Sequence, residues 1–287
     1  MILITGSTGF IGSYLVRDLS KDYILRCIIR KKKIEPTKNT ELFYADILDK
    51  ASLEKAFNGI KIVIHVAALT DGKKEDILKT NIEGTRNLVE LSKKYKIERF
   101  IFISSDSILL ENKGPYAQSK VESEKIVIDS GLNYTILRPN WVYDDNGEKD
   151  LKQIIYFVKN FPIVPIIGDG NYKLQPVHVK DLVYATKKVL ESKKSYNNIY
   201  SLGGSEEITF NEMVDEVSKN LSLKRKKLHI PITLLDIISP ITKISKWRIK
   251  EIVQSKITNN NKAIKDLDYN PVSIRESLSR MLKWKSY

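Results

Sequence analysis

A glycine-rich turn near the start of the chain constrains the fold most strongly. The apolar run Met1–Ile4 predicts a short strand, and Phe10–Leu19 shows the apolar spacing of a helix. Between them stands Thr5-Gly6-Ser7-Thr8-Gly9-Phe10-Ile11-Gly12. Glycine permits a tight turn, close approach of the backbone to a pyrophosphate and close packing of helix on strand. This succession predicts a dinucleotide-binding unit with phosphates at the helix N-terminus.

Strand-like and helix-like segments alternate through roughly the first half of the chain. The continuous apolar runs Ile62–Val66 and Phe100–Ile103 are typical of strands buried on both faces. Longer segments with helical character cover Asp76–Tyr95 and Tyr116–Ile128. Alternation of this kind implies right-handed crossovers and a parallel sheet covered on both faces. We therefore expect an α/β fold with a Rossmann-type, doubly wound parallel sheet.

Beyond Pro139 the alternation loosens, and the tail reads as largely helical. We expect a Rossmann domain over residues 1–203, of which 147–178 contribute partly to the substrate cleft. A small, mostly helical C-terminal lobe is expected over residues 204–287. Its apolar segment His229–Ile244 is interpreted as lobe core, with a hydrophobic substrate lid as the alternative.

Composition excludes several classes of protein. The chain is 42% apolar and 29% charged, as in an ordinary folded enzyme. Its one cysteine, Cys27, excludes a disulfide framework, and His65, His178 and His229 lack the spacing of metal ligands. No apolar run approaches the ~20 residues that span a bilayer, and the start lacks a signal-peptide pattern. We expect a cytoplasmic protein with no metal site and no membrane span.

The formal net charge of +13 needs an explanation. Nucleic acid, an anionic membrane surface and phosphorylated small molecules are all partners that such a charge suits. Basic clusters occur at Arg30–Lys33 and Lys224–Lys227, without the interleaved aromatic residues of a single-strand binder. We therefore expect no nucleic-acid partner and interpret the excess as a solvated basic surface.

The residue that ends the second predicted strand bears on the cofactor. Folds that prefer NAD place an acidic residue there, which accepts hydrogen bonds from the ribose 2′-hydroxyl. Here the strand runs into Arg30, and no acidic residue follows before Glu35. A guanidinium group suits a 2′-phosphate. The sequence thus favours NADP, with NAD as the alternative.

A tyrosine and a lysine four residues apart form the candidate catalytic pair. With 14 tyrosines in the chain, this spacing alone means little, and it occurs twice. Tyr116 begins a helix and follows a strand that ends near Ser105, whereas Tyr184, paired with Lys188, stands in mid-helix. We interpret Tyr116 as functional and Tyr184 as a packing residue.

Residues four apart share a helix face, so Lys120 can lie beneath the ring of Tyr116. A cation at ~4 Å would lower the pKa of a phenol by up to about three units at an effective dielectric constant near ~20. Such a tyrosine can exchange a proton near neutral pH. Ser105 could hydrogen-bond the same substrate oxygen.

Taken together, these motifs resemble the short-chain dehydrogenase/reductase superfamily, and within it the extended and atypical members, the NAD(P)-dependent epimerase/dehydratase family. They occur in the family's order along essentially the whole chain. The segments that carry the resemblance are Thr5–Gly12, Asp46-Ile47, His65–Ala68, Asn81–Thr85, Ser104-Ser105, Tyr116–Lys120, Leu137–Pro139, Pro176–Asp181 and Asn261–Pro271 with Trp284.

The resemblance implies roles for individual residues. Tyr116 would be the catalytic acid/base, Ser105 its partner on the substrate oxygen, and Lys120 a ligand of the nicotinamide ribose that also lowers the tyrosine pKa. Asn140 and His178 join Ser105 as candidate substrate contacts, although a structural role at the lobe junction is preferred for His178. The expected cofactor site comprises Gly6, Thr8, Gly9, Phe10, Ile11, Gly12, Arg30, Asp46, Ile47, Ala67, Ala68, Asn81, Tyr116, Lys120 and Pro139.

Two departures from the family pattern concern the kind of substrate that the chain could bind. Sugar-nucleotide epimerases usually carry a long insertion between the positions of Ser105 and Tyr116, which is missing here, and Asp144 replaces a usual glycine. The chain is similar in this to compact members that include the NADPH-binding accessory subunit of respiratory complex I.

We expect an NAD(P)-dependent oxidoreductase or epimerase that transfers hydride at a carbinol or carbonyl carbon of a small molecule, a sugar nucleotide among the candidates. A non-catalytic NADP(H)-binding assembly or sensor protein is the alternative. A homodimer is an open alternative for its assembly.

Overall fold

A seven-stranded parallel sheet forms the centre of the molecule, in a computed structural model that describes residues 1–30, 38–147, 149–234 and 246–283. The strand order is β11-β6-β5-β4-β1-β2-β3, so the direction of winding reverses between β1 and β4. Open α/β sheets bind ligands outside the carboxyl ends of the strands at such a reversal. The doubly wound Rossmann-type fold is confirmed. The strands are β1 (Ile2–Thr5), β2 (Leu25–Ile29), β3 (Thr40–Tyr44), β4 (Ile62–His65), β5 (Arg99–Ile103), β6 (Tyr134–Pro139) and β11 (Asn198–Leu202).

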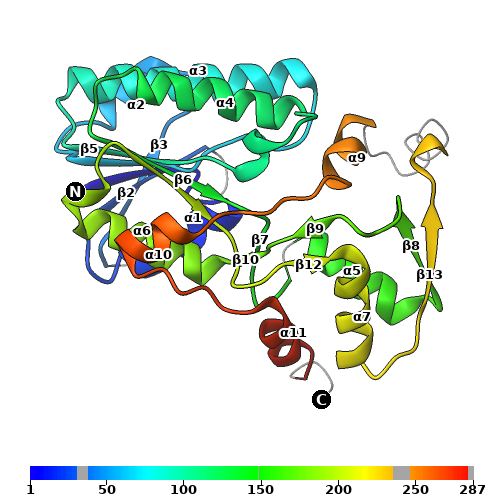
Figure 1. Cartoon of the computed structure of the whole chain (residues 1–287). Helices are drawn as coiled ribbons and strands as arrows, with labels where there is room; N and C mark the ends of the chain where they lie inside the picture. Colours follow the sequence, from blue (N-terminus) through cyan, green and yellow to red (C-terminus); the bar gives the residue numbers. More distant parts are fainter. Residues whose placement is uncertain (31–37, 148, 235–245, 284–287) are drawn as a thin grey trace.

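Helices cover both faces of this sheet (Figure 1). In β1, Ile2 and Ile4 join one hydrophobic core with Leu15 of α1, whereas Leu3 joins the other with Leu88 of α3. The alternation follows from the twofold side-chain period of a strand, and it explains why the predicted strands are continuously apolar. The helices on one face are α2 (Lys50–Lys55), α3 (Lys74–Lys94) and α4 (Pro115–Ile128), and those on the other are α1 (Phe10–Leu19), α6 (Val179–Glu191) and α10 (Asn261–Leu267).

A second, smaller part of the molecule lies beyond the carboxyl ends of the strands, on the right in Figure 1. Strand β8 pairs in parallel with β13, β7 pairs in parallel with β10, and β9 pairs antiparallel with β12. Helix α7 packs against both α5 and α11. The elements are β7 (Val142–Tyr143), α5 (Lys149–Asn160), β8 (Ile163–Ile167), β9 (Lys173–Leu174), β10 (Val177–His178), β12 (Ile208–Thr209), α7 (Phe210–Asn220), β13 (Lys226–Ile230), η3 (Ile232–Leu234), α9 (Lys246–Ile252) and α11 (Ile274–Lys283), while η1 (Asp106–Leu109) and η2 (Lys193–Ser195) belong to the sheet domain.

The hydrophobic cores divide the chain differently from a single boundary after residue 203. Leu151 and Val164 share a core with Met213 and Leu278, so the segment with α5 and β8 packs into the second part. Conversely, Leu267 of α10 packs into the sheet domain. Apolar spacing predicts that a helix forms, but not which core its apolar face joins.

The segment from Lys224 onward contains a strand that was not expected. The basic run Lys224–Lys227 leads into a strand, β13, that the sequence patterns do not predict, because its apolar partner β8 lies far away in sequence. Of the proposed core or lid segment His229–Ile244, residues 235–244 lie outside the described residues.

Candidate active site

The glycine-rich turn has the geometry of a phosphate cradle. Gly6 adopts a φ of +68°, and a Cβ there would lie 2.6 Å from the backbone nitrogen of Ala67. A Cβ at Gly12 would lie 2.0 Å from the carbonyl oxygen of Gly6. Gly9, the N-cap of α1, brings no side chain to cap the helix. The N–H groups of the first turn therefore have no side-chain cap and can bind an anion, so the turn fits a dinucleotide pyrophosphate.

A buried network joins the ends of β1 and β4 beside this cradle. Thr5 Oγ1 contacts His65 Nδ1 at 2.8 Å and accepts a hydrogen bond from the Ala67 N–H at 3.2 Å. His65 Nε2 contacts Thr85 Oγ1 at 3.0 Å. Burial, with the charge of Lys120 adding to it, holds the pKa of His65 well below its usual range. The neutral imidazole thus fixes the backbone of the cradle.

Asn81 ties the loop after β4 to α4, the helix that carries Tyr116 and Lys120. Its Oδ1 accepts from the Leu69 N–H at 2.7 Å, and its Nδ2 donates to the Leu69 carbonyl at 3.0 Å. The same Nδ2 donates to Ser119 Oγ of α4 at 2.8 Å. The expected role of Asn81 in supporting site geometry rests on these contacts.

Arg30 and Asp46 lie at the carboxyl ends of neighbouring strands and face each other. The Arg30 guanidinium approaches the Asp46 carboxylate at 3.5 Å, and the two side chains are 66% and 38% exposed. An exposed pair of this kind contributes little stability, so the guanidinium can exchange partners. Ile47 is buried under α3, where a Cβ at Gly84 would lie 2.5 Å from it. Lys31–Lys33 lie outside the described residues.

Ser105, Tyr116 and Lys120 come together beyond the end of β5. Ser105 lies close enough to Tyr116 to lower its pKa, and the Ser105 side chain accepts from the Ser107 N–H at 3.2 Å, which caps η1. Lys120 Nζ lies 5.8 Å from the centre of the Tyr116 ring. It donates to the Ile103 carbonyl at 2.8 Å. The structure thus assembles the triad that the sequence predicts.

The electrostatics of the triad differ from the expectation. Burial raises the pKa of Tyr116, and the carboxylates of Glu251 and Asp106 raise it further, against a lowering by the Ser105 hydrogen bond. Burial also lowers the pKa of Lys120 to about 7, with Glu124 opposing. The predicted lowering of the Tyr116 pKa is wrong for the chain by itself. Helical spacing places the lysine but does not show how far the site is removed from water.

Asp106 and Glu251 are site residues that the sequence reasoning missed. Asp106 is 5% exposed, and burial raises its pKa to about 6 against the charge of Lys256 and a hydrogen bond from Thr258. Its position directly after Ser105 could have revealed it. Glu251 stands on α9, far away in sequence, and no local signal marks it.

Helix α9 closes over the start of α4. A Cβ at Gly114 would lie 2.5 Å from the Trp247 ring and 2.8 Å from the Glu251 carboxylate. Glycine is therefore needed just before Tyr116 so that α9 can approach. In this way the second part of the molecule supplies one wall of the site.

Asn140 and His178 hold the junction between the two parts. Asn140 Nδ2 donates to the Lys256 carbonyl and to Thr258 Oγ1, both at 2.9 Å, just beyond the end of β6 at Pro139. His178 caps α6 by accepting from the Lys180 N–H at 3.2 Å, and its Nε2 contacts Asp145 at 3.2 Å. These contacts support the structural role for His178.

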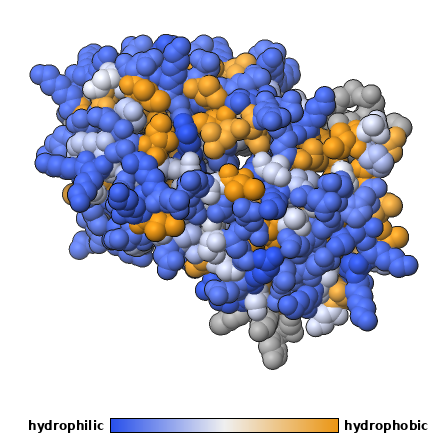
Figure 2. Space-filling view, viewed as in Figure 1, coloured by the Kyte–Doolittle hydropathy of each residue, from blue (hydrophilic) through white to orange (hydrophobic). Residues whose placement is uncertain are grey.

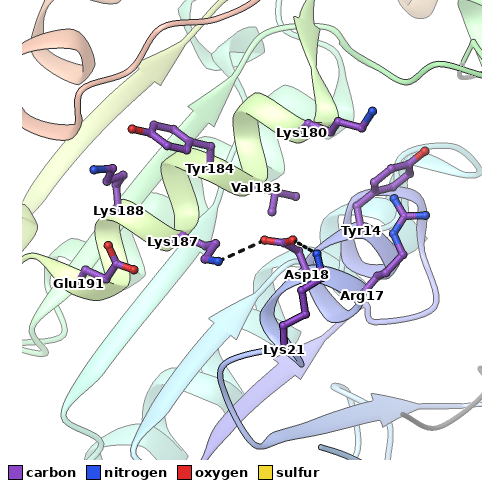
Figure 3. Close-up of a pocket in the computed structure, with 10 residues that line it drawn as sticks. All are labelled: Tyr14, Arg17, Asp18, Lys21, Lys180, Val183, Tyr184, Lys187, Lys188 and Glu191. Carbon is purple, nitrogen blue, oxygen red and sulfur yellow. Dashed lines mark hydrogen bonds and ion pairs between the residues drawn. The ribbon is translucent and has the colours of Figure 1, made fainter. Parts of the chain in front are cut away.

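Tyr184 was expected to be a packing residue, but it does not lie in a hydrophobic core. It is 41% exposed, and its ring centre lies 5.4 Å from Lys188 Nζ. It lines a pocket of about 520 Å³ between α1 and α6, which Figure 3 shows. Lys187 there pairs with Asp18 at 3.6 Å. None of the triad residues lines this pocket.

The chain is similar in sequence and in fold to known proteins. A model of the NAD dependent epimerase/dehydratase family matches residues 2–203. A putative UDP-glucose 4-epimerase of Methanocaldococcus jannaschii is 29% identical, with 99% of this chain and 98% of the relative covered. A solved UDP-glucose 4-epimerase of Thermotoga maritima with UDP-glucose is 25% identical, has a TM-score of 0.80 and covers 99% of this chain and 98% of its own.

A relative of another kind is also similar along its length. The mitochondrial NADH dehydrogenase 1 alpha subcomplex subunit 9 of Dictyostelium discoideum is 24% identical over 97% of this chain and 83% of its own.

Proposed function

Because the chain belongs to the NAD-dependent epimerase/dehydratase family, we propose that it interconverts a carbinol and a carbonyl carbon of a sugar nucleotide with Ser105, Tyr116 and Lys120. The contact between Ser105 and Tyr116 beside the glycine cradle carries this proposal. A nicotinamide cofactor supplies or accepts the hydride in such a reaction. The side chains of this site would handle the proton and orient the reacting oxygen.

The raised pKa of Tyr116 favours the phenol near neutral pH. In the direction of reduction, Tyr116 would therefore donate its proton to the developing alkoxide. Ser105 would hold the same oxygen by a hydrogen bond. Lys120 Nζ donates to the Ile103 carbonyl, and we propose that it also contributes a donor or a charge at a ribose next to Tyr116.

The cofactor we propose is NADP, with NAD as the alternative. Arg30 is exposed at the end of β2, where the ribose 2′-position lies in folds of this type. The Asp46 carboxylate would repel the 2′-phosphate of NADP. The choice between NADP and NAD therefore depends on whether Arg30 or Asp46 has the larger effect. Titration with NADPH and NADH tests it: Arg30→Glu should weaken NADPH binding about tenfold or more and leave NADH binding nearly unchanged. Equal affinities in the unmodified protein would contradict the role of Arg30.

A sugar nucleotide is proposed because the relatives named UDP-glucose 4-epimerases align along almost their whole length. The reaction can stop at reduction or oxidation, or continue through a keto intermediate to epimerisation.

A non-catalytic NADP(H)-binding assembly or sensor protein is the second candidate. It is favoured by the similarity to the complex I subunit and by the raised pKa of Tyr116, which leaves no ready base. A triad whose tyrosine holds its proton and cannot act as a base would then serve only to bind the cofactor.

One experiment separates the two candidates. The protein is incubated with either cofactor and a panel of UDP- and dTDP-sugars, and the products are resolved by chromatography and mass spectrometry. Epimerised, oxidised or dehydrated sugar, lost in Tyr116→Phe, supports the enzyme. Cofactor binding without any turnover of the panel supports the assembly or sensor protein.

A further inference from the structure

Three aromatic side chains gather on the surface at the end of α5, far from the candidate active site in sequence. Tyr156, Phe157 and Phe161 are 57%, 37% and 42% exposed. Their ring centres lie 5.5 to 6.0 Å from one another, so they form one cluster rather than scattered exposed residues. Single exposed apolar residues are ordinary, but a contiguous cluster calls for a partner.

The adjoining β8–β13 ribbon extends this cluster. Ile163 pairs in register with Lys226, and Pro165 with Leu228, so all four side chains project from one face of the ribbon. Ile163 is 48% and Leu228 55% exposed. Figure 2 shows hydrophobic residues along this margin of the molecule. We call the set Tyr156, Phe157, Phe161, Ile163 and Leu228 the aromatic edge.

Basic residues predominate in the two segments that carry the aromatic edge. Neither residues 151–168 nor residues 217–234 contain Asp or Glu, and together they carry seven basic residues: Lys152, Lys159, Lys219, Lys224, Arg225, Lys226 and Lys227.

Among the described residues, two of these seven cations lie within ion-pair distance of a carboxylate. Lys227 pairs with Asp215 at 2.7 Å, and Lys219 lies 4.0 Å from Glu216. Arg225 donates to the carbonyls of Val158 and Lys159 and so joins α5 to the ribbon. Among the described side chains, no ion pair neutralises the four that remain, namely Lys152, Lys159, Lys224 and Lys226.

We propose that the aromatic edge docks the protein on the surface of an anionic phospholipid bilayer. Aromatic rings and apolar side chains insert at the headgroup level, while lysine side chains lie along them and reach the lipid phosphates. Each lysine near an anionic surface adds to binding, which makes the attachment sensitive to salt. Within the described ranges no helix is long and apolar enough to cross a membrane, so the attachment is peripheral.

A second copy of the chain fits this edge less well. A symmetric dimer interface brings the same patch of each subunit face to face, so the unpaired lysines would meet one another. Like charges in such an interface repel. An anionic bilayer instead complements both the rings and the cations. This inference does not depend on the reaction proposed for Tyr116.

Vesicle co-sedimentation of the full chain tests the proposal. Sucrose-loaded vesicles of phosphatidylcholine with phosphatidylserine should retain the protein, and pure phosphatidylcholine vesicles should retain it at least about tenfold less. Tyr156→Ser with Phe161→Ser should weaken binding about tenfold or more, as should Lys224→Glu with Lys226→Glu. A retained thermal unfolding transition and retained cofactor binding show that each variant is folded.

Matched controls come from the sheet domain, on α6 and just after α1. Tyr184→Ser removes a tyrosine that is 41% exposed, close to the 42% of Phe161, and Lys21→Glu inverts an exposed lysine. Both variants should bind vesicles like the unmodified protein. Phe157→Trp should keep binding and add tryptophan fluorescence that brominated lipids quench.

Three outcomes would overturn the proposal. They are failure of the unmodified protein to bind phosphatidylserine vesicles, equal losses in the control variants, and added fluorescence in Phe157→Trp that brominated lipids leave unchanged. Edge variants that turn a dimer into a monomer in gel filtration while still binding vesicles would assign the edge to self-association instead.

Discussion

Burial decides the charge of single residues around the candidate site. Asp106 has a pKa of about 6, above the usual 3.8 of an aspartate, because it is removed from water. Between these values the native chain keeps the proton and the unfolded chain releases it. The contribution of Asp106 to stability therefore falls as the pH rises through this window.

Asp106→Asn should remove this dependence while keeping an acceptor for the Thr258 hydroxyl. Relative to the unmodified protein, the free energy of unfolding of the variant should rise between about pH 4 and about pH 7, by at most about 3 kcal/mol. Urea unfolding at both pH values measures the difference. If the free energies of unfolding of the variant and the unmodified protein differ by the same amount at both pH values, Asp106 is not titrating in the folded protein.

For single residues, the sequence predicts which side chains come together better than it predicts their protonation states. Ser105 lies just beyond the end of β5, and Tyr116 and Lys120 share a helix face, so their meeting follows from local patterns. The pKa of Tyr116 is raised first by burial and then by the charge of Glu251, and both arise only in the tertiary fold. No local pattern contains that information.

At the scale of elements, the glycine turn is the part of the expected cofactor site that the sequence predicts best. Helix α1 begins and ends where the sequence predicts, because its limits are set by the turn and by apolar spacing. Strand β13 escapes prediction because a basic strand on a two-stranded ribbon has no such pattern. Short strands of this kind depend on their partner, here β8.

Gly12→Ala tests the turn as a unit. The added Cβ would lie 2.0 Å from the carbonyl oxygen of Gly6, so the turn must move. We expect cofactor affinity to fall about tenfold or more and the free energy of unfolding to fall by about 1–3 kcal/mol. Gly9→Ala is the comparison, because its Cβ meets the same oxygen at 3.2 Å and should destabilise the fold less. Fluorescence titration and urea unfolding measure the two effects, and equal destabilisation would contradict this packing.

At the scale of the whole molecule, the site is completed by contacts between distant parts. Helix α9 brings Glu251 to Tyr116, and Asn140 fastens residues 256–258 beside Asp106. The sequence predicts two parts but not their exchange of segments, because α5 and α10 join cores across the expected boundary. The walls of the site could therefore not be assigned in advance.

Glu251→Gln tests the electrostatic part of this coupling. Glu251 raises the pKa of Tyr116, so its neutralisation should lower that pKa. For oxidation of a carbinol, which requires the phenolate, the rise of the rate with pH should then shift to lower pH. Glu122→Gln, an exposed position on α4, is the control. An unshifted pH profile in the Glu251 variant would contradict the electrostatic coupling between Glu251 and Tyr116.

Turnover of a sugar nucleotide by Tyr116→Phe, beside Tyr184→Phe, tests the proposed reaction most directly. The Tyr116 variant loses one hydroxyl, so stability should change by about 1 kcal/mol and cofactor affinity should hold within about twofold. Turnover should fall about 10²- to 10⁴-fold, since a general acid/base is lost. Tyr184→Phe, with the same spacing to a lysine but exposed on α6, should leave turnover unchanged. Activity that survives Tyr116→Phe, or equal effects of the two variants, would contradict the assignment of Tyr116 as the proton donor.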